Sequence, residues 1–365
     1  MKINYERRWS DLQGSLGEKD AFVSGLPGNT RYLANSESPP GSPPSSTMNY
    51  VVIPKEGEPI AITSSLEEHR CRHESSVNDI RCWTTYPDIK SDGKSALDVL
   101  KATLSEIKAK NIFSDSKVKL GRSLNVSVSS KVNKLRSIKS PDEIERIKKA
   151  IKQSDAGQAF AHNLVESGEG LTEKEVRSEI DYFMARKGIQ ENSFSTIIAS
   201  GPNAAHSHHS NTDRKLKSGD PVICDFGVFW DGYCSDITRT YFVGGSPSNE
   251  WAKIYNIVME ANRKSTEALV KGTTGHMVDK AGRNFISKRG FGSNFVHGTG
   301  HGFGLEIHEY PSITYKSRVK IENAMAVTIE PGIYIPGKGG VRIEDDVLPD
   351  DDNPIVLTQA KKEIY

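Results

Sequence analysis

The chain lacks several features that would assign it to particular classes of protein. It has four cysteines in 365 residues and no CxxC pair, so a disulfide framework is not expected. No apolar run is long enough to span a membrane, and the opening MKINYERRWSDLQG has no apolar segment typical of a signal peptide. The formal charge of +1 favours neither nucleic acid nor an anionic membrane as a partner. We therefore expect a cytoplasmic protein with reduced thiols.

The length and the pattern of apolar residues predict two domains of the α/β (α+β) class, residues 1–135 and 136–365. The first contains apolar runs broken by turns and a hairpin, YVVIPKEGEPIAIT. Its Pro/Ser-rich segment, residues 38–47, is expected to be an exposed loop, either without a role or gating a substrate. The boundary precedes Ser140-Pro141-Asp142-Glu143, which has the cap residue, first-turn proline and glutamate of a helix start.

The second domain repeats its own pattern. Two helical segments begin at Ser140 and Thr172, the second ending at Gly188, and strand-like segments follow them. Two further helical segments begin at Ser248 and end at Gly290, and strand-like segments follow again. An internal duplication of helix, helix and strands would place two sets of side chains about a pseudo-twofold axis, facing each other.

Five potential metal ligands occur in order along this domain: Asp225, Asp236, His301, Glu330 and Glu344. Asp225 and Asp236 end two runs separated by a Gly-Tyr turn, so a hairpin would bring both carboxylates to one end of a sheet. Glu330 and Glu344 flank the turns of EPGIYIPGKGGVRIE in the same way. Carboxylates and an imidazole suit a pair of divalent cations such as Mn²⁺, Co²⁺, Fe²⁺ or Zn²⁺, which can turn a shared water into hydroxide near neutral pH.

Taken singly, each of these residues has an ordinary explanation. Glu330 precedes a Pro-Gly turn, Glu344 begins an acidic run, and His301 lies in a Gly-rich segment. The complete set, in order, is what favours a metal centre. Cys224 and Cys234 adjoin ligand positions but alternate with them, so we expect the cysteines to pack on the opposite face of the sheet.

These motifs resemble the superfamily of methionine aminopeptidases, prolidases, aminopeptidase P and creatinase, with its pita-bread catalytic domain. DFG…SDITRT, HGTGHGFGLEIHE, EPGIY and VRIEDD carry the resemblance over residues 140–365, and residues 1–135 resemble the N-terminal domain of prolidase, aminopeptidase P and creatinase. The resemblance implies a homodimeric metallopeptidase with two divalent ions, Mn²⁺ or Co²⁺ favoured and Zn²⁺ or Fe²⁺ as alternatives. Its substrates would be small peptides, cleaved between the first residue and a proline at position two.

The resemblance also implies a role for each metal ligand. Asp225 would hold one ion, while Asp236 and Glu344 would bridge both. His301 and Glu330 would complete the second ion, and Glu330 would also shuttle a proton. The hydroxyl of Thr238 would orient one of these ligands.

Further residues would contact the substrate. By the resemblance, His208, His297 and His308 would bind the scissile carbonyl and the oxyanion and wall the proline pocket, and Arg342 would pair with a carboxylate at the substrate's C-terminal side. The family commonly has Leu-Pro before the first of these histidines, whereas here His206, His208 and His209 crowd the loop. The choice of His208 rests on spacing alone.

Several alternatives remain open at this point. Prolidases, which act on dipeptides, and aminopeptidase P, which acts on longer peptides, share all these motifs. A creatinase-like amidinohydrolase that works without metal, or a catalytically inactive binding homologue, could also have this fold.

Overall fold

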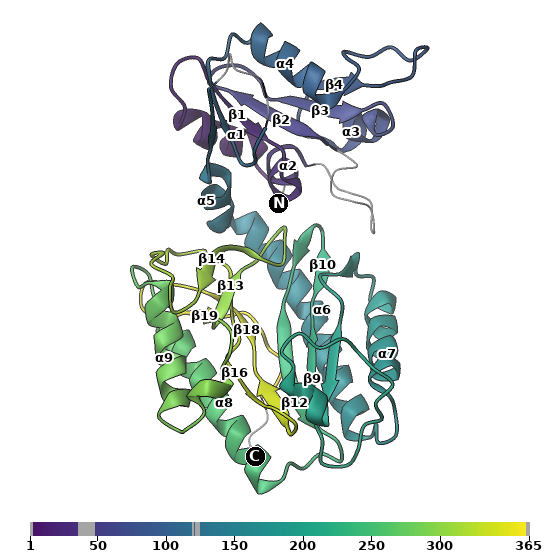
Figure 1. Ribbon diagram of the computed structural model, residues 1–365, viewed down its shortest axis with the longest axis vertical. Coiled ribbons are helices and arrows are strands. Elements are labelled where there is room, and N and C mark those ends of the chain that lie inside the picture. The colour runs from purple at the N-terminus through teal and green to yellow at the C-terminus, as the bar shows by residue number, and fades with distance from the viewer. Residues whose placement is uncertain (1–2, 36–47, 119, 121–124, 363–365) are drawn as a thin grey trace. The chain divides into compact units, whose positions relative to one another are not determined.

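A computed structural model describes residues 3–35, 48–118, 120 and 125–362 of the chain. The Pro/Ser-rich segment, residues 38–47, lies outside these ranges. The chain divides into two compact units, Met1–Arg136 and Ser137–Tyr365, and each has helices and strands of its own (Figure 1).

The first unit is built on a sheet with the strand order β4-β3-β2-β1-β5-β6. The strands are β1 (Asp20–Ser24), β2 (Tyr50–Pro54), β3 (Ile60–Ser64), β4 (Asp79–Trp83), β5 (Asn111–Ser114) and β6 (Asn125–Val128). The helices are α1 (Tyr5–Gly14), α2 (Pro27–Ala34), α3 (Glu68–Glu74), α4 (Ala96–Glu106) and α5 (Lys131–Ser137). The antiparallel pairing of β2 with β3 confirms the predicted hairpin. Val99, Leu100 and Leu104 of α4 pack against the apolar side chains of this sheet.

Among the described residues the second unit has four helices, and three of them begin directly after the predicted cap residues Ser140, Thr172 and Ser248. The four are α6 (Pro141–Glu166), α7 (Glu173–Arg186), α8 (Asn249–Glu267) and α9 (Gly275–Ser287). Ser140 and Glu143 form the predicted capping box at the start of α6, and Thr172 and Glu175 form another at the start of α7. Each box satisfies backbone N–H groups that the first helical turn leaves without partners. Past the ends of α7 and α9, Gly188 and Gly290 have φ values of 79° and 89°, which glycine adopts without steric cost.

Strands follow each helix pair, so the order helix, helix, strands occurs twice (Figure 1). The first set is β7 (Glu191–Asn192), β8 (Ile197–Ser200), β9 (Pro221–Phe226), β10 (Val228–Trp230), β11 (Tyr233–Cys234) and β12 (Ile237–Phe242). The second set is β13 (Gly300–Gly302), β14 (Glu309–Ile313), β15 (Val327–Ile329), β16 (Gly332–Ile335), β17 (Gly339–Arg342), β18 (Asp345–Leu348) and β19 (Ile355–Val356). The sheets are β11-β10-β7, β12-β9-β8, β14-β13-β15-β18-β19 and β16-β17.

The core of the first half lies between its helices and the sheet that contains β9. Cys224 belongs to this core, as the alternation along β9 predicts, with Met184 and Phe226. Helix α6 approaches the sheet closely at Gly157, where an added Cβ would lie 2.6 Å from the Met184 sulfur and 2.8 Å from the Phe226 ring. The helix pair thus holds β9 rigidly, and β9 carries Asp225 on its other face.

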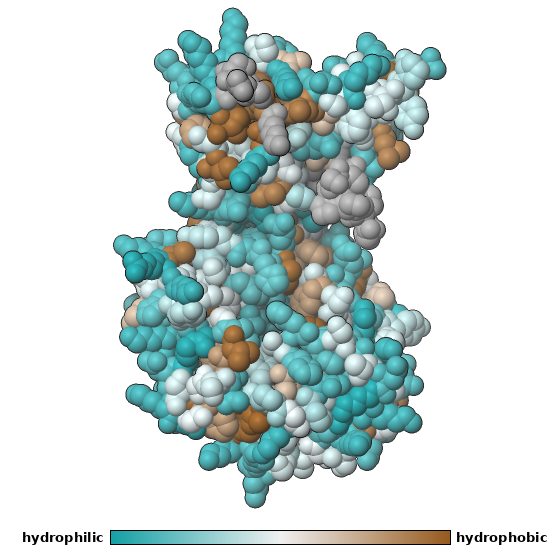
Figure 2. Space-filling model, viewed as in Figure 1, coloured by the Kyte–Doolittle hydropathy of each residue, from teal (hydrophilic) through white to brown (hydrophobic). Residues whose placement is uncertain are grey.

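Within the described ranges, no helix combines the length and apolar content that a membrane crossing requires. On the face shown in Figure 2, residues from 137 onward present mostly polar side chains, with apolar ones in small separate groups. Scattered apolar residues of this kind are normal on a protein surface.

Candidate metal centre and substrate site

Two antiparallel pairs position the four predicted carboxylate ligands. In the ladder of β9 and β12, Asp225 lies opposite Thr238, two residues after Asp236, so both aspartates come to one end of the pair. In the hairpin of β16 and β17, Gly332 pairs with Arg342, and Glu330 and Glu344 flank this pair. Local strand pairing therefore produces two carboxylate pairs, as the turn signals predict.

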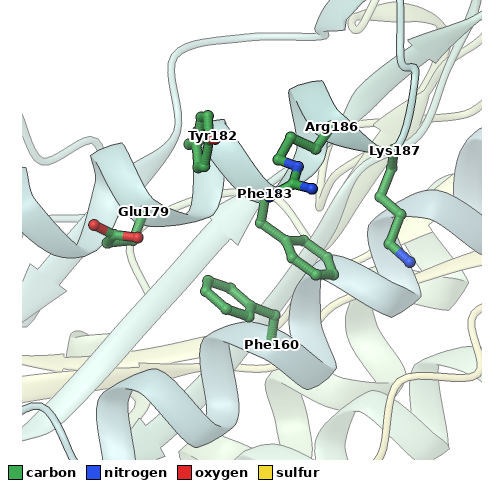
Figure 3. Close-up of a pocket in the computed structure, with 6 residues that line it drawn as sticks. All are labelled: Phe160, Glu179, Tyr182, Phe183, Arg186 and Lys187. Atoms are coloured by element: carbon green, nitrogen blue, oxygen red, sulfur yellow. The ribbon is translucent and has the colours of Figure 1, made fainter.

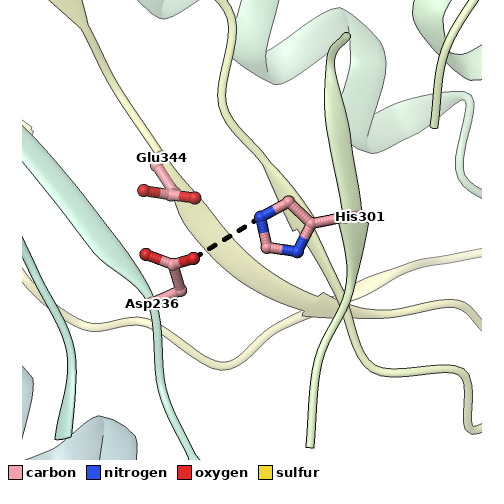
Figure 4. Close-up of side chains that lie close together, drawn as sticks. All are labelled: Asp236, His301 and Glu344. Carbon is pink, nitrogen blue, oxygen red and sulfur yellow. Dashed lines mark ion pairs between the residues drawn. The ribbon is translucent and has the colours of Figure 1, made fainter. Parts of the chain in front are cut away.

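One carboxylate of each pair, Asp236 and Glu344, lies beside the imidazole of His301 (Figure 4). Ligand atoms of Asp236, His301 and Glu344 all lie within 4.8 Å of one another. The Nε2 atom of His301, on β13, is 3.5 Å from an oxygen of Asp236 and 3.5 Å from an oxygen of Glu330. Asp225 is the fifth member, since it lies opposite Thr238 in the ladder of β9 and β12, and the Thr238 hydroxyl donates to Glu344 at 2.6 Å.

Burial makes this cluster of carboxylates costly to ionise. Burial raises the pKa of Asp236 well above its ordinary range, and the charge of Glu344 raises it further. Burial also raises the pKa of Glu344, and the charges of Glu330 and Asp225 add to this shift. For Glu330, burial raises the pKa to about 7. Buried charges in proteins are normally paired or bound to metal, and a divalent cation would supply the opposite charge here.

The donor atoms also fit a divalent cation. Among the described residues, Oδ1 of Asp225 is buried and has no hydrogen-bond partner, so its lone pairs are available to a metal ion. Nδ1 of His301 lies 3.1 Å from the carbonyl oxygen of Gly302. A carbonyl only accepts, so Nδ1 carries the proton and Nε2, facing the carboxylates, offers a lone pair. Burial lowers the pKa of His301 to about 4, which keeps the imidazole neutral.

Hydroxyl groups orient these side chains. Thr238 donates to an oxygen of Glu344 at 2.6 Å, in agreement with the expectation that its hydroxyl holds a ligand. Thr328 accepts from the backbone N–H of His301 at 3.1 Å and donates to Glu330 at 3.5 Å. Each hydroxyl restricts the rotation of a candidate ligand.

Arg342 is committed to protein acceptors. It is 3% exposed and forms an ion pair with Asp225. Its other hydrogen bonds go to Tyr334 at 2.8 Å, to Thr238 at 3.2 Å and to the carbonyl of Ser207 at 3.3 Å. This geometry favours a role in holding Asp225 over the expected contact with a substrate carboxylate.

Two of the three predicted imidazoles, His297 and His308, contact members of the carboxylate and imidazole cluster, Glu330 and His301. The rings of His301 and His308 meet edge to face, with centroids 4.4 Å apart. Burial lowers the pKa of His308, and the neighbouring His208 lowers it further. Burial lowers the pKa of His297 to about 4, with His208 among the smaller causes. The charge of His208 thus acts on both His297 and His308.

The two other histidines of the His208 loop lie elsewhere. His209 Nε2 is 2.8 Å from a carboxylate oxygen of Glu173, and 7% of the His209 side chain is exposed. His206 stacks on His209, with ring centroids 6.0 Å apart. His209 is therefore held by Glu173, and His208 is the histidine of this loop whose charge acts on His297 and His308.

Sequence reasoning missed Tyr334 and Glu173. The hydroxyl of Tyr334 contacts both His297 Nε2 and Arg342 Nη1 at 2.8 Å. Alternation from Glu330 along EPGIY could have placed Tyr334 on the same face of the strand. Glu173 follows a helix cap, a position where an acidic residue is ordinary, so no local signal marked it.

A separate surface pocket lies between α6 and α7 (Figure 3). Phe160 and Phe183 stack there, with ring centroids 4.4 Å apart. The pocket is lined by Phe160, Glu179, Tyr182, Phe183, Arg186 and Lys187. This lining includes none of the predicted site residues, so the pocket is not part of the candidate metal centre.

Comparisons with known proteins agree with this site. Residues 145–350 match the family described as "Metallopeptidase family M24". A relative named Xaa-Pro dipeptidase, from Pyrococcus furiosus, is 39% identical over 265 residues, which cover 73% of this chain and 74% of the relative. The solved Xaa-Pro dipeptidase from Bacillus anthracis has a TM-score of 0.87 at 32% identity, over 99% of both chains. The solved X-Pro aminopeptidase from Thermotoga maritima has a TM-score of 0.85 at 28% identity, also over 99% of both chains. These likenesses over the whole chain confirm the expected fold class, including the pita-bread domain.

Proposed function

The chain belongs to metallopeptidase family M24, and from this premise we propose that it hydrolyses the bond between an N-terminal residue and a proline at position two. The observation that carries the proposal is the convergence of Asp236, His301 and Glu344, with ligand atoms within 4.8 Å of one another. Relatives named for Xaa-Pro cleavage support the choice of substrate.

Two divalent cations, Mn²⁺ or Co²⁺ before Zn²⁺ or Fe²⁺, would be held by Asp225, Asp236, His301, Glu330 and Glu344. When bound, the cations would polarise the scissile carbonyl and make a nucleophile available at neutral pH. Thr238 and Thr328 would hold the side chains of Glu344 and Glu330 in place through their hydroxyls.

Glu330 would carry the proton to the leaving proline nitrogen. The side chain of Glu330 is 18% exposed, more than that of Asp225 at 11% or Asp236 at 7%. One of its oxygens is 3.5 Å from His301, and the other is 4.0 Å from His297. A carboxylate that faces both the ligands and the substrate site can act as general acid and base without moving.

The imidazoles would divide their work. Nδ1 of His297 is 2.7 Å from the carbonyl of Gly298, so it carries the proton, and Nε2 accepts from the Tyr334 hydroxyl. His297 would therefore wall the proline pocket, while His208 and His308 would donate to the carbonyl oxygen as negative charge develops. One such donor contributes about 2.7–4 kcal/mol to the reduction of the barrier.

The decisive experiment is product analysis on Xaa-Pro and Xaa-Pro-Yaa peptides with added Mn²⁺ or Co²⁺. Cleavage of dipeptides alone would make the protein a prolidase, and cleavage of longer peptides an aminopeptidase. If neither kind of peptide is cleaved, the proposal is wrong. Activity that survives a chelator would support the creatinase-like alternative, and a purified protein that binds no metal would support the inactive homologue. A homodimer stays a prediction from the resemblance, and light scattering tests it.

A further inference from the structure

Two buried carboxylates lie beneath the loops that carry His208 and His297. Glu173 is the first residue of α7, Asp279 lies on α9, and both are 0% exposed. These helices are the second of each helix pair in the duplicated unit. A fully buried charge is costly unless it is well hydrogen-bonded, so each needs an explanation.

Glu173 joins the two ends of the loop that carries His208. One carboxylate oxygen accepts from the backbone N–H of Ser200 at 2.8 Å, from its hydroxyl at 2.7 Å and from the side-chain amide of Asn203 at 3.0 Å. The other accepts from the backbone N–H of Thr212 at 2.9 Å and from its hydroxyl at 2.7 Å. The same oxygen is 2.8 Å from His209 Nε2. A single side chain therefore holds residues 200–212 at both ends and beside His208.

These contacts keep Glu173 charged. Burial would raise the pKa of Glu173, but hydrogen bonds from His209, Thr212 and Ser200 outweigh it and lower the pKa to about 2. Hydrogen bonds to an ionised acceptor are roughly twice as strong as neutral ones. Since the carboxylate holds His209, it also fixes the backbone next to His208.

Asp279 does the same for the segment that carries His297. It accepts from the Thr299 hydroxyl at 2.9 Å and holds Arg283 through two hydrogen bonds of 2.8 Å. Arg283 in turn donates to the carbonyls of Phe295 at 2.8 Å and His297 at 2.5 Å. The carboxylate and its arginine thus fix the backbone on both sides of the His297 ring.

We propose that Glu173 and Asp279 are positioning residues of the peptidase site, with Glu173 fixing His208 and Asp279 fixing His297. The inference rests on the proposed function. The two carboxylates are at different helical positions, Asp279 one turn further into its helix than Glu173. The two residues are therefore alike in their contacts and not in their helical positions. Each carboxylate links a helix to the loop that carries one of the histidines.

Double-mutant cycles on the metal-loaded full chain test the proposal. Glu173→Gln keeps the shape of the side chain but replaces one accepting oxygen by an NH₂ group, which then faces other hydrogen-bond donors. We expect kcat on an Xaa-Pro peptide to fall about tenfold. In a His208→Ala background the same change should cost less than about twofold, because the residue that it positions is gone. In a His297→Ala background it should keep its full cost. Asp279→Asn should cost less than about twofold in the His297→Ala background and keep its full cost in the His208→Ala background.

An equal cost of Glu173→Gln in both backgrounds would mean a general structural role and would overturn the proposal. Glu179→Gln, on the same helix and exposed, is the matched control and should stay within about twofold of wild type. If Glu173→Gln does not fold, Thr212→Val goes through the same cycles. It keeps the charge of Glu173 but removes the hydroxyl that donates to Glu173 and accepts from Asn203 and from the backbone N–H of Arg214.

Hydrogen exchange separates this inference from the proposed function. Glu173→Gln should speed exchange of the Ser200 and Thr212 amides, which donate to Glu173, whereas Asp279→Asn should leave both unchanged. If the wild type cleaves no Xaa-Pro peptide, the proposed function fails while exchange still tests the anchor. Unchanged exchange in Glu173→Gln would overturn the anchoring role even in an active enzyme.

Discussion

Replacing Glu330 by glutamine should stabilise the metal-depleted protein at pH 8 and weaken the metal-loaded one. Burial, with the charge of Asp225 as a further contribution, raises the pKa of Glu330. Glutamine has the same shape and can still accept from Thr328, so the change removes mainly the charge. A carboxylate that only contributes to structure would give the opposite sign without metal.

The magnitude follows from proton linkage. The pKa of Glu330 rises from 4.5 to about 7 on folding. Below pH 4.5 the group is protonated in both states and costs nothing. As pH rises from 4.5 to 7, the folded state binds more protons than the unfolded state, so stability is lost across this window. The difference of about 2.5 between the two pKa values, at about 1.4 kcal/mol for each pH unit, gives about 3 to 4 kcal/mol.

Urea unfolding with a chelator, at a series of pH values, measures this difference. Glu330→Gln should match wild type near pH 4.5 and exceed it by about 3 to 4 kcal/mol at pH 8. With Mn²⁺ at a hundred times its Kd, wild type should gain about 2.7 kcal/mol and the variant less. Glu322→Gln, at an exposed position, is the control and should stay within about 0.5 kcal/mol of wild type. A variant that is less stable without metal at pH 8, or a difference that does not change with pH, would refute the reasoning.

Three further predictions concern the same site. Asp236→Ala should abolish both bound metal, measured by elemental analysis, and peptide cleavage, and retention of metal would contradict its place in the ligand set. His208→Ala should keep its metal but lose about 10²–10³ in kcat, the scale of one oxyanion donor; a near-normal His208→Ala beside a dead His206→Ala would reverse the choice of histidine. Gly300→Ala should lower metal affinity in a calorimetric titration, because the added Cβ would lie 1.9 Å from the backbone oxygen of Thr328 and push β13 away. Unchanged metal affinity in Gly300→Ala would show that His301 tolerates movement of its strand.

Much of the fold could be read from local signals. The capping boxes at Ser140 and Thr172 and the hairpin of β2 and β3 involve residues close in sequence, and the structure has all of them. The alternation that buries Cys224 behind Asp225 follows from the two-residue period of a strand. These features depend on backbone geometry, which a short stretch of sequence specifies.

The candidate site divides between what the sequence determined and what the tertiary structure decided. Turn signals determined that Asp225 and Asp236, and then Glu330 and Glu344, would form two pairs, because a hairpin is a local structure. Only the folded chain decided that the pairs meet at His301, since sheet packing brings together residues that no turn connects.

Adjacent histidines show the same division at the level of single side chains. His208 and His209 are neighbours with the same chemistry, and spacing alone could not show which one faces the site. The choice depends on Glu173, 36 residues before His209, and likewise the partner of Arg342 is Asp225, 117 residues away. Such contacts form only when distant elements pack against each other. Packing buries the charged side chains, and a buried charge is destabilising unless it is paired.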